Sequence, residues 1–197
     1  MNLPNKLSLL RVILAPVFVV VVVLPLPSVV WRVLAAAIFI LTSLTDMLDG
    51  MIARKCNMVT DFGKFIDPLA DKFMVFCALI TLLFKSTADD QGFFSVMLLA
   101  ATLIVIFREL AITSLRLLVS SNSGVVIAAG WLGKVKTVTQ ILCILMIILE
   151  PIIVPVSLPI SGSHLFSYIL MAAMCIMTVW SGINYVKAYW HQLDPTK

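Results

Sequence analysis

The sequence predicts an all-α integral membrane protein with six transmembrane helices. Of its 197 residues, 61% are hydrophobic and 12% are charged, and the mean hydropathy is +1.11. Soluble domains average about 45–50% apolar residues, which is well below this value. Six apolar runs alternate with short polar segments, and about 20 apolar residues suffice for a helix to cross a bilayer. No room remains for a second sizeable domain, so residues 1–197 are expected to form a single membrane domain.

The first span is predicted from Val12 to about Leu26, after the basic amphipathic segment 1–11. A cleaved signal peptide would also combine a basic segment with an apolar run. No small-residue cleavage site follows this run, only the sequence Leu-Pro-Leu-Pro-Ser. We therefore expect an uncleaved first helix.

The second and third spans, predicted at about 28–53 and 63–85, are joined by a short polar loop. The stretch from Asp46 to Asp71 covers the end of one span and the start of the next. It holds five of the ten acidic residues of the chain. The highest density of acidic residues is thus expected at the ends of two membrane helices.

The last three spans are predicted at about 93–118, 133–150 and 165–189. Residues 119–133 are expected to form a loop or a re-entrant turn, and the proline-rich stretch 151–163 turns the chain back.

The basic residues predict the orientation of the bundle. With six spans, one membrane face receives twelve of the fourteen lysines and arginines, in segments 1–11, 54–72, 108–136 and 187–197. Only Arg32 and Lys85 fall near the other face. Because lysine and arginine accumulate on the cytoplasmic side, that face is predicted to be cytoplasmic.

The cysteines predict no redox or zinc chemistry. The chain has four of them, and their spacing shows no paired motif. Reduced, buried and inert thiols are expected at Cys56, Cys77, Cys143 and Cys175.

Four aspartates are predicted to converge at the cytoplasmic face. Asp46 and Asp49 are three residues apart and Asp67 and Asp71 are four apart, so each pair shares one face of its helix. A charge at mid-membrane costs about 2.5–3.5 kcal/mol on insertion scales, so these residues are expected near the aqueous end. Their grouping matches the needs of two divalent cations about 3.5–4 Å apart, which would clamp a phosphoryl displacement. The alternative is an interfacial ion-pair network with nearby lysines and arginines.

The same stretch carries a family resemblance. The pattern D-x2-D-G-x2-A-R-x8-G-x3-D-x3-D, from Asp46 to Asp71, resembles the signature of the CDP-alcohol phosphatidyltransferases at all eight fixed positions. That family displaces CMP from a CDP-linked lipid with an alcohol hydroxyl. The whole chain most resembles members that use glycerol 3-phosphate. The resemblance therefore implies transfer of a phosphatidyl group from CDP-diacylglycerol to glycerol 3-phosphate, a step of phospholipid biosynthesis.

The resemblance also implies a metal site and a homodimer. Two Mg²⁺ or Mn²⁺ ions would be held by the four aspartates, and Asp71 would act as general base. A multi-pass protein of the cell membrane is expected, in contact with membrane lipids, with its active site facing the cytoplasm and with no nucleic-acid partner.

Binding of the CDP-lipid is implied for Gly50, Arg54 and Gly63 by their match to the motif. Asn5 and Thr60 are further candidates. The first segment resembles the family's entry segment, which implies that Asn5, Ser8 and Arg11 lie near the nucleotide. The alternative for these residues is ordinary helix capping and a polar flank that reaches the headgroups. For Thr60 the alternative is a solvated loop.

A second group of basic residues is predicted at the cytoplasmic ends of spans four and five. It comprises Arg108, Arg116, Lys134 and Lys136. Such a cluster beside a carboxylate site suggests a pocket for the acceptor's phosphate. Topology signals, headgroup contacts and counter-ions to the aspartates are the alternatives. Glu109 is expected to pair with one of the two arginines, while Thr113, Thr137 and Gln140 are candidates for holding the acceptor's hydroxyls.

Other functions remain open at this point. Inositol phosphate fits the second cluster as well as glycerol phosphate does, whereas serine carries no phosphate. An aspartate-rich prenyltransferase is disfavoured, because the chain lacks a second aspartate motif. A cation transporter is disfavoured by the absence of an internal repeat and by the expected placement of every carboxylate at one membrane face.

Overall fold

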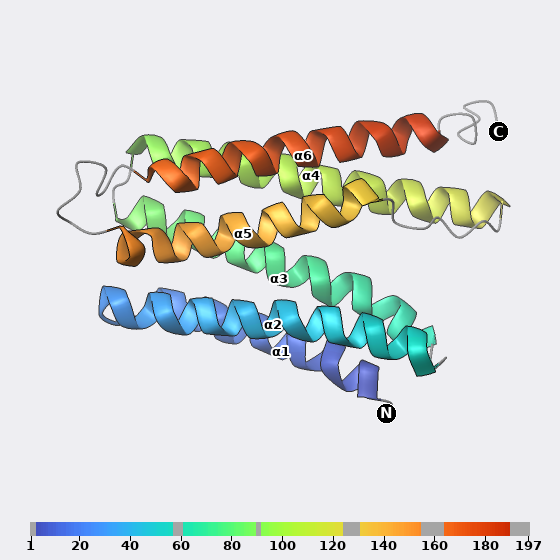
Figure 1. The fold of residues 1–197 in the computed structure, drawn as a ribbon, viewed down its shortest axis with the longest axis horizontal. Helices are drawn as coiled ribbons and strands as arrows, with labels where there is room; N and C mark the ends of the chain where they lie inside the picture. The colour runs from blue at the N-terminus through green and yellow to red at the C-terminus, as the bar shows by residue number, and fades with distance from the viewer. Residues whose placement is uncertain (1–2, 57–60, 90–91, 124–130, 155–163, 190–197) are drawn as a thin grey trace.

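A computed structural model describes residues 3–56, 61–89, 92–123, 131–154 and 164–189, and six helices account for nearly all of them. Within the helices, the side chains of residues 3–6, 46–56, 61–68, 71, 117 and 119–123 lie outside the description. The helices are α1 (Leu3–Val23), α2 (Ser28–Cys56), α3 (Asp61–Ala88), α4 (Gly92–Ser123), α5 (Trp131–Ile153) and α6 (Leu165–Tyr189) (Figure 1).

The predicted spans correspond one to one with these helices, and the largest differences in their boundaries are in α1 and α4. Helix α1 begins at Leu3, so most of the basic segment is helical, and it ends before Pro25 and Pro27, which disfavour helical backbone. Helix α4 continues to Ser123, so the loop predicted at 119–133 is wrong in its first five residues.

Four helices are long and apolar enough to cross a membrane, within the part of the chain that the structure describes: α2, α4, α5 and α6. The apolar part of α1, Leu7–Val23, is shorter. Helix α3 begins with charged residues, including Asp61, Lys64 and Asp67, which lower its mean hydropathy. The chain is therefore a multi-pass membrane protein, and the six predicted spans exceed those that length and composition identify.

The helices form an up-and-down bundle. Helix α1 packs against α2 and α3, while α6 packs against α4 and α5, and contacts of α3 with α4 and of α2 with α5 join the two groups (Figure 1). Because the chain reverses at every connection, one end of the bundle collects the C-terminal ends of α2, α4 and α6 and the N-terminal ends of α1, α3 and α5 (Figure 1). We call this the motif end and the opposite one the far end.

The bundle is apolar both inside and outside. Each helix contributes a fully buried side chain to one common core: Phe18, Phe39, Leu79, Leu98, Ile144 and Met174. Many large apolar side chains also lie on the outer surface, such as Phe107, which is 76% exposed. An apolar exterior of this kind fits contact with lipid rather than water. Buried hydroxyls bond their own helix, as Thr42 does to the carbonyl of Ile38 at 2.7 Å.

Two charged side chains tie the helices together at the far end. Arg32 of α2 donates from Nη1 to the carbonyl of Ile148 at 3.1 Å, and its guanidinium lies 4.4 Å from the ring centre of Trp31. Glu150 of α5, which is 4% exposed, accepts hydrogen bonds from the backbone of Phe166 at 2.9 Å and of Ser167 at 2.8 Å. Glu150 thereby satisfies backbone donors in the first turn of α6. The expectation that every carboxylate lies at one face is therefore wrong, because Glu150 serves this structural role at the far end.

Candidate active site

The four motif aspartates lie on α2, which ends at the motif end, and on α3, which begins there (Figure 1). Asp46 and Asp49 are in the last third of α2, and Asp67 and Asp71 are in the first half of α3. Both segments are helical, so the spacing of three and of four residues still predicts that each pair shares a helix face. Helix α1 packs against both α2 and α3. The aspartate side chains lie outside the described residues, so the convergence of four carboxylates stays a prediction.

The predicted CDP-lipid site falls on the same segments. Gly50 and Arg54 are in α2, Gly63 is in α3 and Asn5 is in the first turn of α1. Their side-chain surroundings are outside the description, and Thr60 lies outside the described residues altogether.

Arg11 is buried inside the bundle. It is 1% exposed, and Ser8, one turn earlier, is fully buried. The interpretation of these residues as a flank reaching the headgroups is therefore wrong, because α1 begins further out and carries them into the bundle. A guanidinium removed from water requires hydrogen-bonding or anionic partners.

A cavity of about 30 Å³ lies beside Arg11, which is enough for a water molecule. Its polar lining includes Thr42 and Ser43 of α2 and Thr137 of α5. Thr42 lies one turn before Asp46 in α2. The buried polar interior thus continues from α1 toward the aspartate motif.

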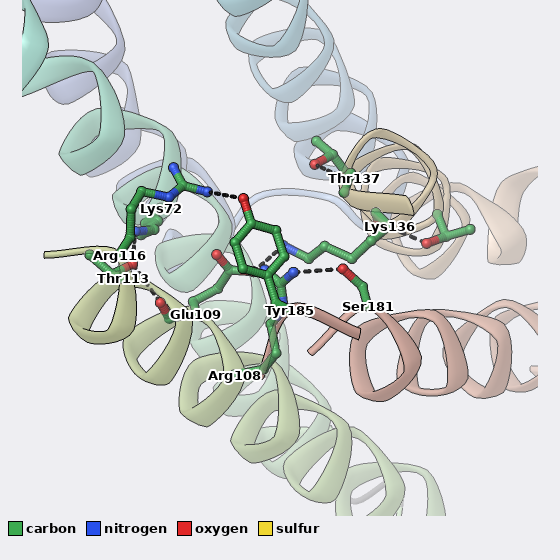
Figure 2. A network of polar contacts seen from close by, with 11 residues as sticks. Lys72, Arg108, Glu109, Thr113, Arg116, Lys136, Thr137, Ser181 and Tyr185 are labelled. Carbon is green, nitrogen blue, oxygen red and sulfur yellow. Dashed lines mark hydrogen bonds and ion pairs between the residues drawn. The ribbon is translucent and has the colours of Figure 1, made fainter. Parts of the chain in front are cut away.

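The charged residues of α4 and α5 form a network centred on Glu109 (Figure 2). Lys136 Nζ donates to Oε1 of Glu109, and Arg108 Nη1 lies 3.1 Å from the same oxygen. Lys136 is 5% exposed and Glu109 is 9% exposed. The expected pairing of Glu109 with an arginine is confirmed, and Lys136 is a second partner.

Hydrogen bonds extend this network to α3 and α6. Lys72 Nζ donates to Thr113 Oγ1, which in turn donates to the carbonyl of Glu109 at 2.6 Å. Arg108 Nη2 donates to Ser181 Oγ at 2.7 Å. We call Lys72, Arg108, Glu109, Thr113, Lys136 and Ser181 the Glu109 network. It joins four helices at one level of the bundle.

The other two predicted cations are exposed. Arg116 Nη2 donates to Tyr185 Oη at 3.1 Å, and its guanidinium lies 5.7 Å from the ring centre of that tyrosine. Lys134 lies in the first turn of α5 and is not hydrogen-bonded into the Glu109 network among the described residues. The structure therefore divides the predicted cluster into an inner pair, in which Arg108 is partly buried and Lys136 is buried, and an outer pair, Arg116 and Lys134.

The residues suggested for the acceptor's hydroxyls have different surroundings. Thr137 donates to the carbonyl of Gly133 at 3.0 Å, as an ordinary helical threonine does. Thr113 belongs to the Glu109 network. Gln140 is buried, and its Nε2 has no hydrogen-bond partner in the described part of the chain.

Sequence reasoning missed Ser181 and Tyr185 of α6. They carry no charge, and polar residues near a helix end are common. Their spacing of four residues was the available signal, because it places both on one face of an apolar helix. Lys72 was expected only as one of the nearby lysines and arginines that could form ion pairs with the aspartates.

The donor chemistry of the motif fits a hard divalent cation. Aspartate oxygens on two helices are the ligand type that Mg²⁺ and Mn²⁺ prefer. Among the described side chains, no three histidine, cysteine, aspartate or glutamate residues are grouped so that they could hold a metal ion. The four motif aspartates are not among these described side chains. Cys77, Cys143 and Cys175 are free thiols, as predicted, but of these three only Cys143 is buried, so the predicted burial is wrong for Cys77 and Cys175.

Curated relatives cover almost the whole chain. A protein of Bacillus subtilis (strain 168), CDP-diacylglycerol–glycerol-3-phosphate 3-phosphatidyltransferase, is 38% identical over 98% of this chain and 97% of its own length. A protein of the same name from Yersinia enterocolitica is 34% identical, with the same coverage of 98% and 97%. A probable phosphatidylglycerophosphate synthase of Mycobacterium tuberculosis (strain ATCC 25618 / H37Rv) is 38% identical over 94% of this chain and 80% of its own length.

A family model agrees with these relatives. The model of the CDP-alcohol phosphatidyltransferases matches residues 1–180, which contain the aspartate motif and nearly all of the six helices. Members of this family generally depend on divalent cations. The chain therefore belongs to the CDP-alcohol phosphatidyltransferase family.

Proposed function

We propose that the chain transfers the phosphatidyl group of CDP-diacylglycerol to glycerol 3-phosphate, giving phosphatidylglycerophosphate and CMP. The observation that carries the proposal is the complete motif from Asp46 to Asp71, at the same end of the bundle as a group of buried and exposed cations. The names of full-length relatives at 34–38% identity support the same reaction.

The aspartates are proposed to serve the donor. Asp46, Asp49, Asp67 and Asp71 would hold two Mg²⁺ or Mn²⁺ ions, which when bound neutralise charge on the diphosphate. Gly50, Arg54 and Gly63 would bind the CDP part, with Asn5 and Thr60 nearby.

The proposed reaction exchanges one phosphorus–oxygen bond for another. The acceptor's hydroxyl oxygen forms a bond to the phosphorus that carries diacylglycerol, and the bond from that phosphorus to the oxygen of CMP breaks. Asp71 accepts the hydroxyl proton as general base.

The cations are proposed to serve the acceptor. The phosphate dianion of glycerol 3-phosphate would be bound by Arg108, Arg116, Lys134 and Lys136. Charge-assisted hydrogen bonds to phosphate are roughly twice as strong as neutral ones, and arginine can supply two parallel bonds. This second cluster supports an acceptor that carries a phosphate.

The proposed arrangement in the cell has six transmembrane helices in the cell membrane. Residues 1–197 form one domain and the motif end faces the cytoplasm, where both substrates are available. Supporting observations are the up-and-down course of the helices and the excess of lysine and arginine at the motif end. We also propose a homodimer, by analogy with the family.

Release of CMP by the purified protein tests the function. We expect release from CDP-diacylglycerol only when glycerol 3-phosphate and Mg²⁺ or Mn²⁺ are both present, and none in the presence of a chelator. Inositol phosphate and serine supplied in parallel would identify a different acceptor. Cation flux into liposomes without any release of CMP would refute an enzyme and favour a transporter.

A further inference from the structure

Glu109 is a buried carboxylate among the cations that are proposed to bind the acceptor's phosphate. Its Oε1 contacts both Lys136 Nζ and Arg108 Nη1, the latter at 3.1 Å (Figure 2). By Coulomb's law alone, a negative charge at such a place repels an incoming phosphate. If Glu109 nevertheless favours binding of the acceptor, its effect on the neighbouring cations must be larger than this repulsion.

The first part of that role is to hold two cations at one point. Arg108 belongs to α4 and Lys136 to α5, and both reach the same carboxylate oxygen. Lys136 is among the least exposed charged residues described. Without the carboxylate, the two like charges would repel each other, and Lys136 would lose the opposite charge that Glu109 supplies. The two side chains would then be expected to separate.

The second part is to fix the direction of Arg108. On its other side the guanidinium donates to Ser181 Oγ at 2.7 Å. The stem of Arg108 lies against Gly182, where an added Cβ would meet Arg108 Cγ at 3.3 Å. Among the described residues, Glu109 and Ser181 accept two of the five hydrogen bonds that the Arg108 guanidinium can donate, so donors remain for an oxyanion. Arg108 is thus oriented from two sides without being saturated.

The third part is a connection to the aspartate helix. Thr113 Oγ1 accepts a hydrogen bond from Lys72, which directly follows Asp71 in α3, and donates to the carbonyl of Glu109 at 2.6 Å. The turn of α4 that carries Glu109 is therefore joined to α3 as well as to α5 and α6. A shift of this turn would alter the cations and their distance from the motif together.

We propose that Glu109 is a positioning residue for the acceptor. It holds Arg108 and Lys136 in the arrangement that receives the phosphate of glycerol 3-phosphate, despite the repulsion by its own charge. This inference rests on the proposed function, and it adds a residue that binds neither substrate.

The proposal is decided by whether one substitution weakens or strengthens the binding of glycerol 3-phosphate. Glu109→Gln keeps the size of the side chain and removes its charge. If Glu109 positions the cations, the variant binds glycerol 3-phosphate about tenfold more weakly, equal to the loss of one charge-assisted contact. If Glu109 acts only as a repelling charge, the variant binds it more tightly. Calorimetric titration of the full-length protein in detergent with glycerol 3-phosphate measures this directly.

Steady-state kinetics separate positioning from a general loss of structure. In Glu109→Gln we expect the KM for glycerol 3-phosphate to rise about tenfold, and kcat and the KM for CDP-diacylglycerol to change less than about twofold. Glu109→Asp keeps the charge and should recover part of the loss. Glu150→Gln changes another buried glutamate, at the far end, and should leave both KM values unchanged.

A second substitution covers the case in which Glu109→Gln does not fold. Ser181→Ala removes one support of Arg108 without altering any charge, and should weaken glycerol 3-phosphate binding about threefold. Unchanged or tighter binding in Glu109→Gln, or in Ser181→Ala if only that variant folds, overturns the proposal.

The proposed function would fail in a different way. A wild-type protein that binds glycerol 3-phosphate but releases no CMP would refute phosphatidyl transfer, while the titrations would still decide the role of Glu109. A wild-type protein that binds no glycerol 3-phosphate would overturn both.

Discussion

The carboxylate oxygens of four aspartates carry the proposed donor chemistry. We expect Asp→Asn at Asp46, Asp49, Asp67 or Asp71 to lower kcat at least about 100-fold, because each change removes a ligand charge that would stabilise the transition state by several kcal/mol. Release of CMP under saturating substrates and metal measures the loss, with elution on size exclusion as the check on folding.

Asp89 provides a matched control for these variants. It is an exposed aspartate at the far end, directly after α3, so Asp89→Asn should retain wild-type activity. Activity close to that of the wild type in two of the four motif variants would contradict the two-metal arrangement.

The outer pair of cations allows acceptor and donor to be tested separately. Arg116→Gln and Lys134→Gln are each expected to raise the KM for glycerol 3-phosphate about tenfold to a hundredfold, because a charge-assisted hydrogen bond contributes about 1.5–3 kcal/mol. The KM for CDP-diacylglycerol should change much less. Initial rates with each substrate varied in turn give both constants.

Arg54→Gln is the counterpart on the donor side. Arg54 belongs to the motif, so its neutralisation should impair the use of CDP-diacylglycerol whichever acceptor is supplied. Equal losses for both substrates in all three variants would mean that these cations act as one shared electrostatic field. A separate acceptor pocket would then be ruled out.

At the level of single residues, the sequence predicted charges better than burial. The basic residues Arg108 and Arg116 were predicted at one end of span four, and both do contact α6. Sequence did not indicate that Lys136 is buried while Lys134 is exposed, because the two differ only in the direction they take from α5. That direction depends on the packing of α5 against α6 and α2, which lies outside any local pattern.

At the level of helices, apolar runs were sufficient to predict all six elements. The lengths of the apolar runs, and the prolines between α1 and α2, predicted most helix boundaries within a few residues. The exceptions were α1 and α4, where helical backbone extends into polar sequence beyond the apolar run. Helix geometry tolerates polar residues once a neighbouring helix supports the turn, so composition alone places such ends too early or too late.

The start of α6 depends on a residue of α5. We expect Glu150→Gln to lower the free energy of unfolding by about 1.5–3 kcal/mol, because the carboxylate accepts backbone and side-chain hydrogen bonds from the first turn of α6. For a chain of this size the melting temperature falls by about 2–4 °C for each kcal/mol. Thermal unfolding in detergent, followed by circular dichroism, measures the shift.

Ser167→Ala is a graded control for this cap. It removes the hydroxyl's bond to Glu150 and leaves the carboxylate and both backbone donors in place, so a smaller decrease is expected. Melting temperatures that do not differ from the wild type in either variant would show that Glu150 contributes no net stability to α6.

At the level of the whole molecule, orientation is the property that decides access to substrates. Lys187→Cys lies at an exposed position of the motif end and Thr87→Cys at an exposed position of the far end. In a background without native cysteines, we expect a membrane-impermeant maleimide to label only Thr87→Cys in intact cells. Both variants should react after the cells are opened.

Labelling of Lys187→Cys from outside would reverse the proposed orientation. The aspartate motif would then face away from the cytoplasmic pools of both substrates. The native lysine at position 136 is a poor reporter, because it is buried and paired with Glu109.

The order of the helices also affects how such a protein can diverge. Under the proposed assignment, α1–α3 bind the donor and α4–α6 supply most of the acceptor's contacts. Donor binding and acceptor binding are therefore encoded in consecutive halves of the gene. A lineage can therefore exchange its acceptor alcohol by substitutions after residue 92 while the inherited motif stays intact. The hydrogen bond between Lys72 and Thr113 crosses this boundary. A chimera that joins α1–α3 of one family member to α4–α6 of another is expected to need a compatible pair at these two positions.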